Sequence, residues 1–226
     1  MLYYIHDLDD NLQRTSPGAR DAFQKAILAT AAEDCGLGHA PEEIFEQAVK
    51  GAELHNDFTF FLIERYGVQW ETLHFGFARR MDRSVIVPYD HLSGHFEALG
   101  DEAQHCLLTH SHFSWARDSL AINKIGPWIP EERIVSLEMY DKEMKNKGPR
   151  GFVMALDKLG GPDVKDVHFT DDSLANHVTA KKMGLRTIWT SHGRDMPAEY
   201  IPYVDQVVDN MEVFMRQQVA LAKPAP

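Results

Sequence analysis

Short apolar runs with strand character alternate with longer stretches of helical periodicity over most of this 226-residue chain. The first run, residues 2–5, ends abruptly at polar residues, which is typical of a buried parallel strand. Further runs follow residue 103, mostly separated by stretches with helical spacing. This alternation predicts an α/β fold built on a doubly wound parallel sheet. The strand-like runs are 106–108, 134–137, 167–170, 187–189 and 206–208, and the helical stretches are 115–125, 151–159, 176–183 and 211–221.

The region between residues 17 and 88 has a different pattern. Ser16 and Pro17 predict a helix start, with serine as the N-cap and proline at the first helical position. Further helices are predicted from Pro41, from about Asp57 and over 70–81, and only the short apolar run 85–87 resembles a strand. We therefore expect a core domain of residues 1–16 and 89–226, with an α-helical domain, 17–88, inserted after the first strand.

Composition narrows the classes of partner. The formal net charge is -11, with no run of Lys or Arg, so the phosphates of nucleic acids and of anionic membranes would be repelled. The first residues lack the basic start and the apolar stretch of a signal peptide, and no segment has the ~18 consecutive apolar residues of a membrane span. The two cysteines form no CxxC pair. We expect a cytoplasmic protein without nucleic-acid or membrane partners.

Paired carboxylates follow the first predicted strand. Asp7 and Asp9 are spaced so that both can face one crevice at the strand end. One carboxylate can then attack as a nucleophile while the other transfers protons. An Asp-rich turn that caps a helix is the structural alternative.

Three further candidates follow later in the chain. A hydroxyl at Thr109, after the run 106–108, can hold a phosphoryl oxygen, and a lysine at 145 or 147 can neutralise phosphate charge. A turn or cap and a solvated surface lysine are the alternatives for these two. Asp171 and Asp172 follow another strand, where adjacent carboxylates repel unless a cation lies between them. Their hard oxygen ligands favour Mg²⁺, and an N-cap is the alternative role.

The order of these features resembles that of the haloacid dehalogenase-like hydrolase superfamily, whose motifs are an Asp-x-Asp pair, Thr or Ser, Lys and an acidic pair. The specific signals are DLDD at 7–10 and FTDDSLANHVTAKKMGLRTIW at 169–189. The resemblance covers 1–16 and 89–226, and the inserted helices fall where that family has a helical cap that closes over the site and selects the substrate. It implies a Rossmann-like core and Mg²⁺-dependent hydrolysis of a small phosphomonoester, such as a nucleotide or sugar phosphate.

By this resemblance, Asp7 is the nucleophile that forms an aspartyl-phosphate. Asp9 protonates the leaving oxygen and later deprotonates the attacking water. The Mg²⁺ ligands are Asp7, the backbone carbonyl of Asp9 and Asp172, with Asp171 in support. True dehalogenases that resemble this family lack an acid at the position of Asp9, so its presence favours phosphate chemistry.

The same resemblance implies that Thr109, His110 and Lys145 bind phosphate. Spacing does not decide between Lys145 and Lys147 for the catalytic lysine, and we favour Lys147. Two residues depart from the family pattern: His110 stands where Asn is frequent, and Asn11 where Thr or Val is usual. We expect Asn11 to form hydrogen bonds at little cost.

The remaining histidines and aromatic residues carry weaker signals. Strand alternation predicts that His6 points away from Asp7 and is a core histidine. The histidines at 105, 110 and 112 are expected to be solvated or to face substrate rather than to bind zinc. Aromatic residues at 58, 60 and 61, with His55 and Asn56, are a possible substrate lid, although a packed helical core is the commoner reason for such spacing.

Three other functions remain open on the sequence. A phosphomutase of the same fold would return the phosphoryl group to its product, and a catalytically silent protein would only bind phosphate. A receiver-type signalling module uses similar residues, but its phospho-acceptor follows a middle strand and it lacks a large helical insertion. The partner is expected to be a small phosphorylated molecule, and the protein is a monomer or a homodimer.

Overall fold

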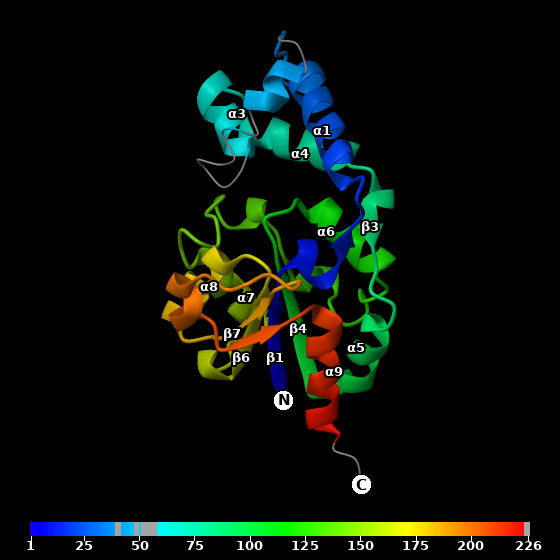
Figure 1. The fold of residues 1–226 in the computed structure, drawn as a ribbon, viewed down its shortest axis with the longest axis vertical. Coiled ribbons are helices and arrows are strands. Elements are labelled where there is room, and N and C mark those ends of the chain that lie inside the picture. Colours follow the sequence, from blue (N-terminus) through cyan, green and yellow to red (C-terminus); the bar gives the residue numbers. More distant parts are fainter. Residues whose placement is uncertain (39–41, 48–49, 51–57, 224–226) are drawn as a thin grey trace. The chain divides into compact units, whose positions relative to one another are not determined.

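The computed structural model describes residues 1–38, 42–47, 50 and 58–223, with the side chains of 58–61 left out. The chain divides into two compact units, which are described separately (Figure 1). The first contains Met1–Arg14 and Ile86–Pro226, and the second contains Thr15–Val85. At the boundary, β2 (Arg14–Thr15) and β3 (Ile86–Val87) form a two-stranded sheet.

The first unit is built on a six-stranded sheet in the order β5-β4-β1-β6-β7-β8, in which every pairing is parallel. This confirms the predicted doubly wound α/β core. Its strands are β1 (Leu2–His6), β4 (Ala103–Leu108), β5 (Ile134–Val135), β6 (Val167–Asp171), β7 (Arg186–Thr190) and β8 (Gln206–Val208).

The central strand β1 lies between β4 and β6, and Ile5 is in register with Cys106 on one side and Phe169 on the other. The chain first fills the β4 side of the sheet and then crosses to β6, so the strand order reverses next to β1. In open parallel sheets, ligands bind beyond the carboxyl ends of the strands at such a reversal. Asp7 and Asp171 lie at these strand ends.

Helices cover both faces of this sheet (Figure 1). On one face, Tyr4 packs edge-on against Phe214 of α9, and α5 packs against α9. On the other face, Phe152 of α7 packs edge-on against Phe169 of β6. The helices of this unit are α5 (Leu92–Leu99), α6 (Phe113–Ile122), α7 (Arg150–Lys158), α8 (Leu174–Met183) and α9 (Met211–Ala222). Helix α5 was not among the elements predicted from the sequence.

The second unit is helical where the structure describes it. Its labelled helices are α1 (Ala19–Ala29), α3 (Phe58–Tyr66) and α4 (Trp70–Arg80), and residues 42–47 are also helical. Buried apolar side chains form its core, which includes Ile27, Ile44, Leu62 and Leu73. The guanidinium of Arg80 in α4 pairs with Asp34, which follows α1.

The predicted start of the first helix is wrong. Helix α1 begins at Ala19 with Gly18 as its N-cap, and the Ala19 amide donates to the carbonyl of Ser16 at 2.9 Å. Ser16–Ala19 is therefore a turn, because Pro17 is favoured at the second position of a turn as well as at a helix start. His55 and Asn56, which were considered for a substrate lid, lie outside the described residues, as do the predicted helix starts at Pro41 and Asp57.

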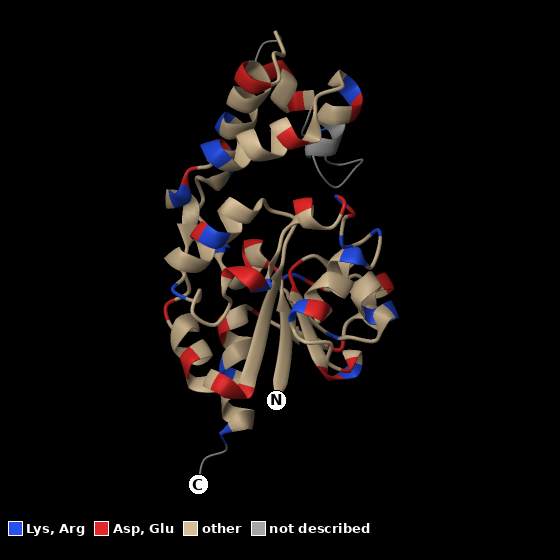
Figure 2. Ribbon diagram, turned by 180° about the vertical axis from the view of Figure 1, so that it is seen from behind, with Lys and Arg blue, Asp and Glu red and all other residues tan. Residues whose placement is uncertain are grey.

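Two further features concern the whole chain. No helix in the described ranges combines the length and the apolar character needed to cross a membrane. Acidic and basic residues are interspersed along the ribbon of both units (Figure 2). The two signs of charge are therefore not segregated into separate units.

Candidate active site

Asp7 directly follows β1, and its amide donates to the carbonyl of Thr170 at 2.8 Å, which extends the pairing with β6. The buried side chain of Asn11 fixes this strand end. Its Nδ2 donates to the Asp7 carbonyl at 2.9 Å and to Thr170 Oγ1 at 3.0 Å, and its Oδ1 accepts from Thr190 Oγ1 at 3.2 Å. Asn11 therefore ties Asp7 to both β6 and β7, which confirms that it forms hydrogen bonds.

The two carboxylates after β6 have different surroundings. Asp171 is fully buried, and it accepts hydrogen bonds from the Ser173 amide at 2.7 Å and from Asn176 Nδ2 at 2.9 Å. The Asp172 carbonyl accepts from Trp189 Nε1 at 2.9 Å, and its carboxylate lies 3.2 Å from Arg194 Nη2. Asp171 is thus held by neighbouring donors, whereas Asp172 is paired with a half-exposed arginine.

Lys145 joins the two strand ends. Its Nζ donates to Asp7, to Asp171 Oδ2 at 2.7 Å and to the carbonyl of Leu108 at 3.3 Å, and its side chain is 1% exposed. Lys147 is exposed, so the preference for Lys147 as the active-site lysine is corrected in favour of Lys145. The two lysines diverge because the Lys147 amide donates to the Met144 carbonyl at 2.8 Å, which closes a turn around Lys145.

Thr109 and His110 follow β4, and Thr109 is buried whereas His110 is partly buried. Thr109 Oγ1 accepts from the Ser111 amide at 3.0 Å, and the Thr109 carbonyl accepts from Tyr140 Oη at 2.9 Å. His110 Nε2 accepts the backbone N–H of Lys145 at 2.8 Å. His110 therefore holds the loop that carries the lysine, and its direct contact with phosphate stays a prediction.

Asp9 points into a separate set of donors. Its Oδ1 accepts from Gln13 Nε2 at 2.7 Å and from Trp115 Nε1 at 3.0 Å, while its Oδ2 accepts from Ser111 Oγ at 2.6 Å. The carboxylate of Asp9 is thus fixed against α6 and is not part of the group that surrounds Lys145.

Three carboxylates form a candidate cation site. Within the part of the chain that the structure describes, Asp7, Asp171 and Asp172 are the group whose oxygen atoms lie within 4.8 Å of one another. Hard oxygen donors of this kind suit Mg²⁺. Lys145 supplies one positive charge among three carboxylates, and Arg194 contacts Asp172 from its half-exposed position. The residues therefore fit a divalent cation.

The pKa values follow from this crowding. Burial raises the pKa of Asp7 well above its usual range, and the charges of Asp171 and Asp172 add to the effect while Lys145 opposes it. Burial and the charge of Asp171 raise the pKa of Asp172 to about 7. Burial also disfavours ionisation of Asp171, but Lys145 and the surrounding donors outweigh it and lower its pKa. A second cation would relieve the repulsion that remains at Asp7 and Asp172.

The histidines near β4 make different contacts from one another. His105 lies within β4, is buried and stacks on Tyr4 at 5.1 Å between ring centroids, so the expectation of solvation is wrong for this residue. His112 caps α6 by accepting from the Ser114 amide. His6 is a core histidine as predicted, and its Nδ1 lies 2.9 Å from Thr170 Oγ1.

Several residues of this region were not identified as functional from the sequence. Asn176 lies one helical turn beyond the acidic pair, and its place in the 169–189 motif was the available signal. Trp115 and Ser111 reach Asp9 from about a hundred residues away, and Arg194 was interpreted as part of a loop. No local sequence pattern predicts these long-range contacts.

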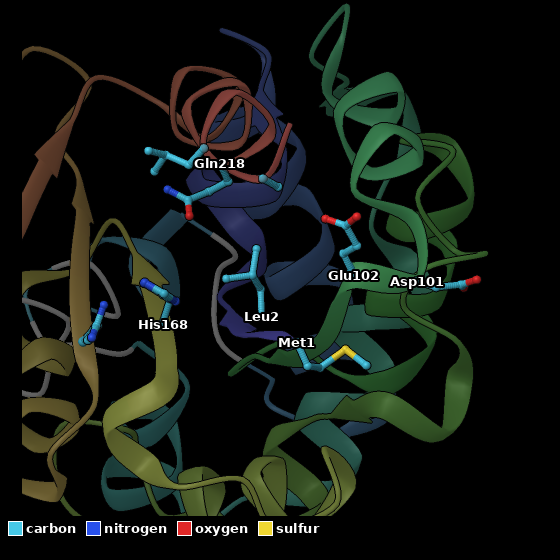
Figure 3. A pocket seen from close by; sticks show the side chains of 9 residues that line it. Met1, Leu2, Asp101, Glu102, His168 and Gln218 are labelled. Carbon is cyan, nitrogen blue, oxygen red and sulfur yellow. The ribbon is translucent and has the colours of Figure 1, made fainter. Parts of the chain in front are cut away.

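A separate pocket of about 600 Å³ lies at the amino-terminal ends of the strands, whereas the candidate active site lies at their carboxyl ends (Figure 3). It is lined by residues at the starts of strands, among them Leu2, His168 and Arg186, and by Gln218 of α9. None of the residues around Lys145 contributes to it. It is therefore distinct from the candidate active site.

Solved structures share this fold. The chain superposes on an HAD phosphatase from Thermococcus onnurineus with a TM-score of 0.67 and 14% identity, over 96% of this chain and 98% of that one. A hydrolase from Pseudomonas syringae gives 0.63 and 17%, over 99% and 100%. A Bacillus subtilis protein classed as an HAD hydrolase, with magnesium bound, gives 0.61 and 15%, over 96% and 97%.

A dehalogenase is also similar, with a TM-score of 0.60 and 17% identity over 96% of each chain. No protein-family model and no curated protein sequence matches this chain. Identities this low show the fold alone. The resemblance seen in the sequence motifs is thereby confirmed at the level of the fold, and the chemistry must be argued from the residues.

Proposed function

The chain has the haloacid dehalogenase-like fold, and on that premise we propose that it is a Mg²⁺-dependent phosphohydrolase for a small phosphomonoester. The observation that carries the proposal is the arrangement around Lys145, whose Nζ contacts both Asp7 and Asp171 at the ends of adjacent strands. A buried carboxylate beside a fixed cation suits attack on an anionic phosphate, because the cation attracts the phosphoryl group and orients the nucleophile.

In the proposed reaction, an Asp7 oxygen attacks phosphorus and the bond from phosphorus to the leaving oxygen breaks. Asp9 in its protonated form gives its proton to that oxygen, so the alcohol leaves neutral. Water then attacks the aspartyl-phosphate, Asp9 takes its proton back from the water, and the bond between Asp7 and phosphorus breaks. The sum is one phosphomonoester and one water converted to an alcohol and inorganic phosphate.

The residues that would hold Mg²⁺ are Asp7 and Asp172, with the carbonyl of Asp9 and with Asp171 in support. The ion would neutralise the repulsion between a carboxylate nucleophile and an anionic phosphate. Lys145 holds Asp7 in place, and Thr109 is the proposed hydroxyl donor to phosphoryl oxygens.

Dehalogenation is the alternative chemistry on this fold, since a dehalogenase is among the similar structures. Two features favour phosphate. Asp9 supplies the acid that an alkoxide leaving group needs and a halide does not. The cluster of Asp7, Asp171 and Asp172 suits a metal, which displacement of a halide does not require.

We assign substrate selection to the helical unit Thr15–Val85, as the cap of this enzyme. Its separate apolar core allows it to vary independently of the catalytic residues. An exchange of this unit for that of another phosphatase of the fold is expected to change the substrate preference while the dependence on Asp7 and Mg²⁺ is kept.

The test is a screen for phosphate release over many phosphomonoesters, with Mg²⁺ or with EDTA. We expect Mg²⁺-dependent release of phosphate that is lost in Asp7→Asn. After acid quenching, the wild-type protein should contain a phosphoenzyme that is heavier by one phosphoryl group, and this species should also be absent in Asp7→Asn. Asp166→Asn, at an exposed site, is the matched control and should keep full activity. Release that persists with EDTA or in Asp7→Asn contradicts the proposal, and transfer to a second hydroxyl in place of water would identify a phosphomutase.

A further inference from the structure

The carboxylate of Asp9 is held by three donors from two parts of the chain. Gln13 Nε2 and Trp115 Nε1 both donate to Oδ1, at 2.7 and 3.0 Å, and Ser111 Oγ donates to Oδ2 at 2.6 Å. Three donors on one partly buried carboxylate are more than are needed to satisfy it, because a single hydrogen bond or water contact would serve. The arrangement therefore restricts how this side chain can be oriented.

Two of these donors are buried, and the third is held through its main chain. Gln13 is fully buried, and its Oε1 accepts from Asn123 Nδ2 at 3.3 Å. Trp115 is 3% exposed and lies in the first turn of α6. The Ser111 amide donates to Thr109 Oγ1 at 3.0 Å, so Ser111 connects Asp9 to the proposed phosphate-binding hydroxyl. Rotation of the Asp9 carboxylate would therefore break its contacts with two buried side chains, Gln13 and Trp115, and with the hydroxyl of Ser111.

The two oxygens of Asp9 are not equivalent in this frame. Each carboxylate oxygen has two acceptor directions. Among the residues that the structure describes, Gln13 and Trp115 take both directions on Oδ1, whereas Ser111 takes only one on Oδ2. The remaining direction on Oδ2 is the place where a proton can be carried, or a leaving oxygen or water met, without loss of a protein contact.

We infer that Gln13, Trp115 and Ser111 are positioning residues that fix Asp9 so that its Oδ2 alone exchanges the proton in both steps of the reaction. This inference rests on the proposed phosphohydrolase function. In the first step, the Oδ2–H bond breaks as the proton moves to the leaving oxygen, and in the second the same atom takes a proton from water. Oδ1 remains an acceptor for Gln13 and Trp115 throughout.

The same contacts could instead have a purely structural role and only hold α6 against the loop after β1. A structural role and a role in positioning Asp9 predict different kinetics. Loss of a structural contact slows the reaction of all substrates alike. Loss of proton delivery slows substrates in proportion to the basicity of their leaving group, because a stable phenolate departs without a proton and a basic one does not. The value of kcat/KM covers only the steps up to formation of the phosphoenzyme, so it isolates the step in which Asp9 acts as an acid.

The experiment measures kcat/KM with Mg²⁺ for a series from p-nitrophenyl phosphate to phenyl and methoxyphenyl phosphates. The variants are Trp115→Phe, Ser111→Ala and, as a reference without the acid, Asp9→Asn. Trp128→Phe is the matched control, because Trp128 packs against Phe96 and is not one of the three donors to Asp9. We expect a loss below about threefold for p-nitrophenyl phosphate and of about thirtyfold for the most basic leaving group, which is a part of the roughly 10²–10⁴-fold that general acid catalysis supplies.

A steeper dependence on leaving-group basicity in both variants, in the direction of Asp9→Asn, supports the inference. A uniform loss across the series in either variant, with folding shown intact by thermal unfolding, overturns it. If one variant fails to fold, the other decides. Failure of the proposed function is a separate result, because it appears in the wild type as release that is independent of Asp7 or of Mg²⁺.

Discussion

The backbone N–H of Lys145 donates to Nε2 of His110 at 2.8 Å, so the histidine after β4 fixes the lysine that contacts Asp7. A ring nitrogen that accepts in this way is unprotonated. Burial and the charge of Lys145 lower the pKa of His110 to about 3, which keeps the ring neutral. His110, the residue that departs from the family pattern, thus positions Lys145 by accepting the main-chain N–H of that lysine.

The first prediction compares two amides at position 110. The amide of glutamine can reach the place of Nε2 in histidine, whereas that of asparagine reaches only the place of Nδ1. His110→Asn leaves the buried N–H of Lys145 without its acceptor, which costs about 1–3 kcal/mol. We expect kcat to fall about tenfold in His110→Asn and less than about threefold in His110→Gln, within the energies of one hydrogen bond. Phosphate release and urea unfolding measure the two effects, and equal losses in both variants would contradict the role of Nε2.

The second prediction separates the two lysines. Lys145→Met removes the cation from between Asp7 and Asp171, and we expect activity to fall by about a hundredfold to a thousandfold, in the range of a lost electrostatic stabiliser. Breaking a buried ion pair on one side also lowers the free energy of unfolding by about 3–5 kcal/mol, of which added Mg²⁺ should restore a part. Lys147→Met, at an exposed position, should change neither quantity measurably. Larger losses of activity and stability in Lys147→Met than in Lys145→Met would contradict the role of Lys145 in the proposed mechanism.

The strand ends of the site were predictable because each follows an apolar run. Asp7 directly follows β1 and Asp171 ends β6, and the topology of a parallel sheet brings adjacent carboxyl ends together. The lysine was not predictable in the same way. Spacing to the next helix does not show how a turn closes, and the turn around Lys145 decides which lysine enters the site.

Other differences have physical reasons as well. The proline at 17 is compatible with both a turn and a helix start, and Gly18 shifts the balance towards the turn. Helix α5 was missed although Leu92, Phe96 and Leu99 have helical spacing and are buried. The contact between Trp115 and Asp9 joins residues 106 apart, which no local pattern encodes.

The third prediction concerns metal binding and pH. Mg²⁺ binds ionised carboxylates, so a group with a pKa of about 7 must lose its proton when the ion binds in more acidic solution. For Asp172 this makes the apparent affinity about tenfold weaker at pH 6 than at pH 8, and the raised pKa of Asp7 adds to the effect. Titration calorimetry in two buffers of different ionisation enthalpy measures both the affinity and the proton released. We expect Asp172→Asn to lose most of the binding, and an affinity equal at both pH values would argue against Asp172 as a ligand.

The fourth prediction concerns a stack of core histidines. His6, His105 and His168 pack on Tyr4 with ring centroids 5.1–5.6 Å away. Burial and the charge of His168 lower the pKa of His6 to about 3, against about 6.5 in an unfolded chain. Between these values the unfolded state binds the proton and the folded state does not. The contribution of His6 to stability is therefore complete above pH 6.5 and falls progressively below it, by about 2 kcal/mol at pH 5.

Asp7 and Asp172 oppose this trend in the absence of metal, because their raised pKa values favour the folded state at low pH. The contribution of His6 to the free energy of unfolding is therefore measured as a difference between the wild type and a variant that lacks this histidine. His6→Asn keeps an amide where Nδ1 meets Thr170 but does not titrate. Urea unfolding at pH 7.5 and pH 5 should show that its stability falls by about 2 kcal/mol less than that of the wild type, whereas His91→Asn, at an exposed site, should follow the wild type. An equal fall in all three proteins would mean that His6 is protonated in the folded state, in conflict with its burial in this stack.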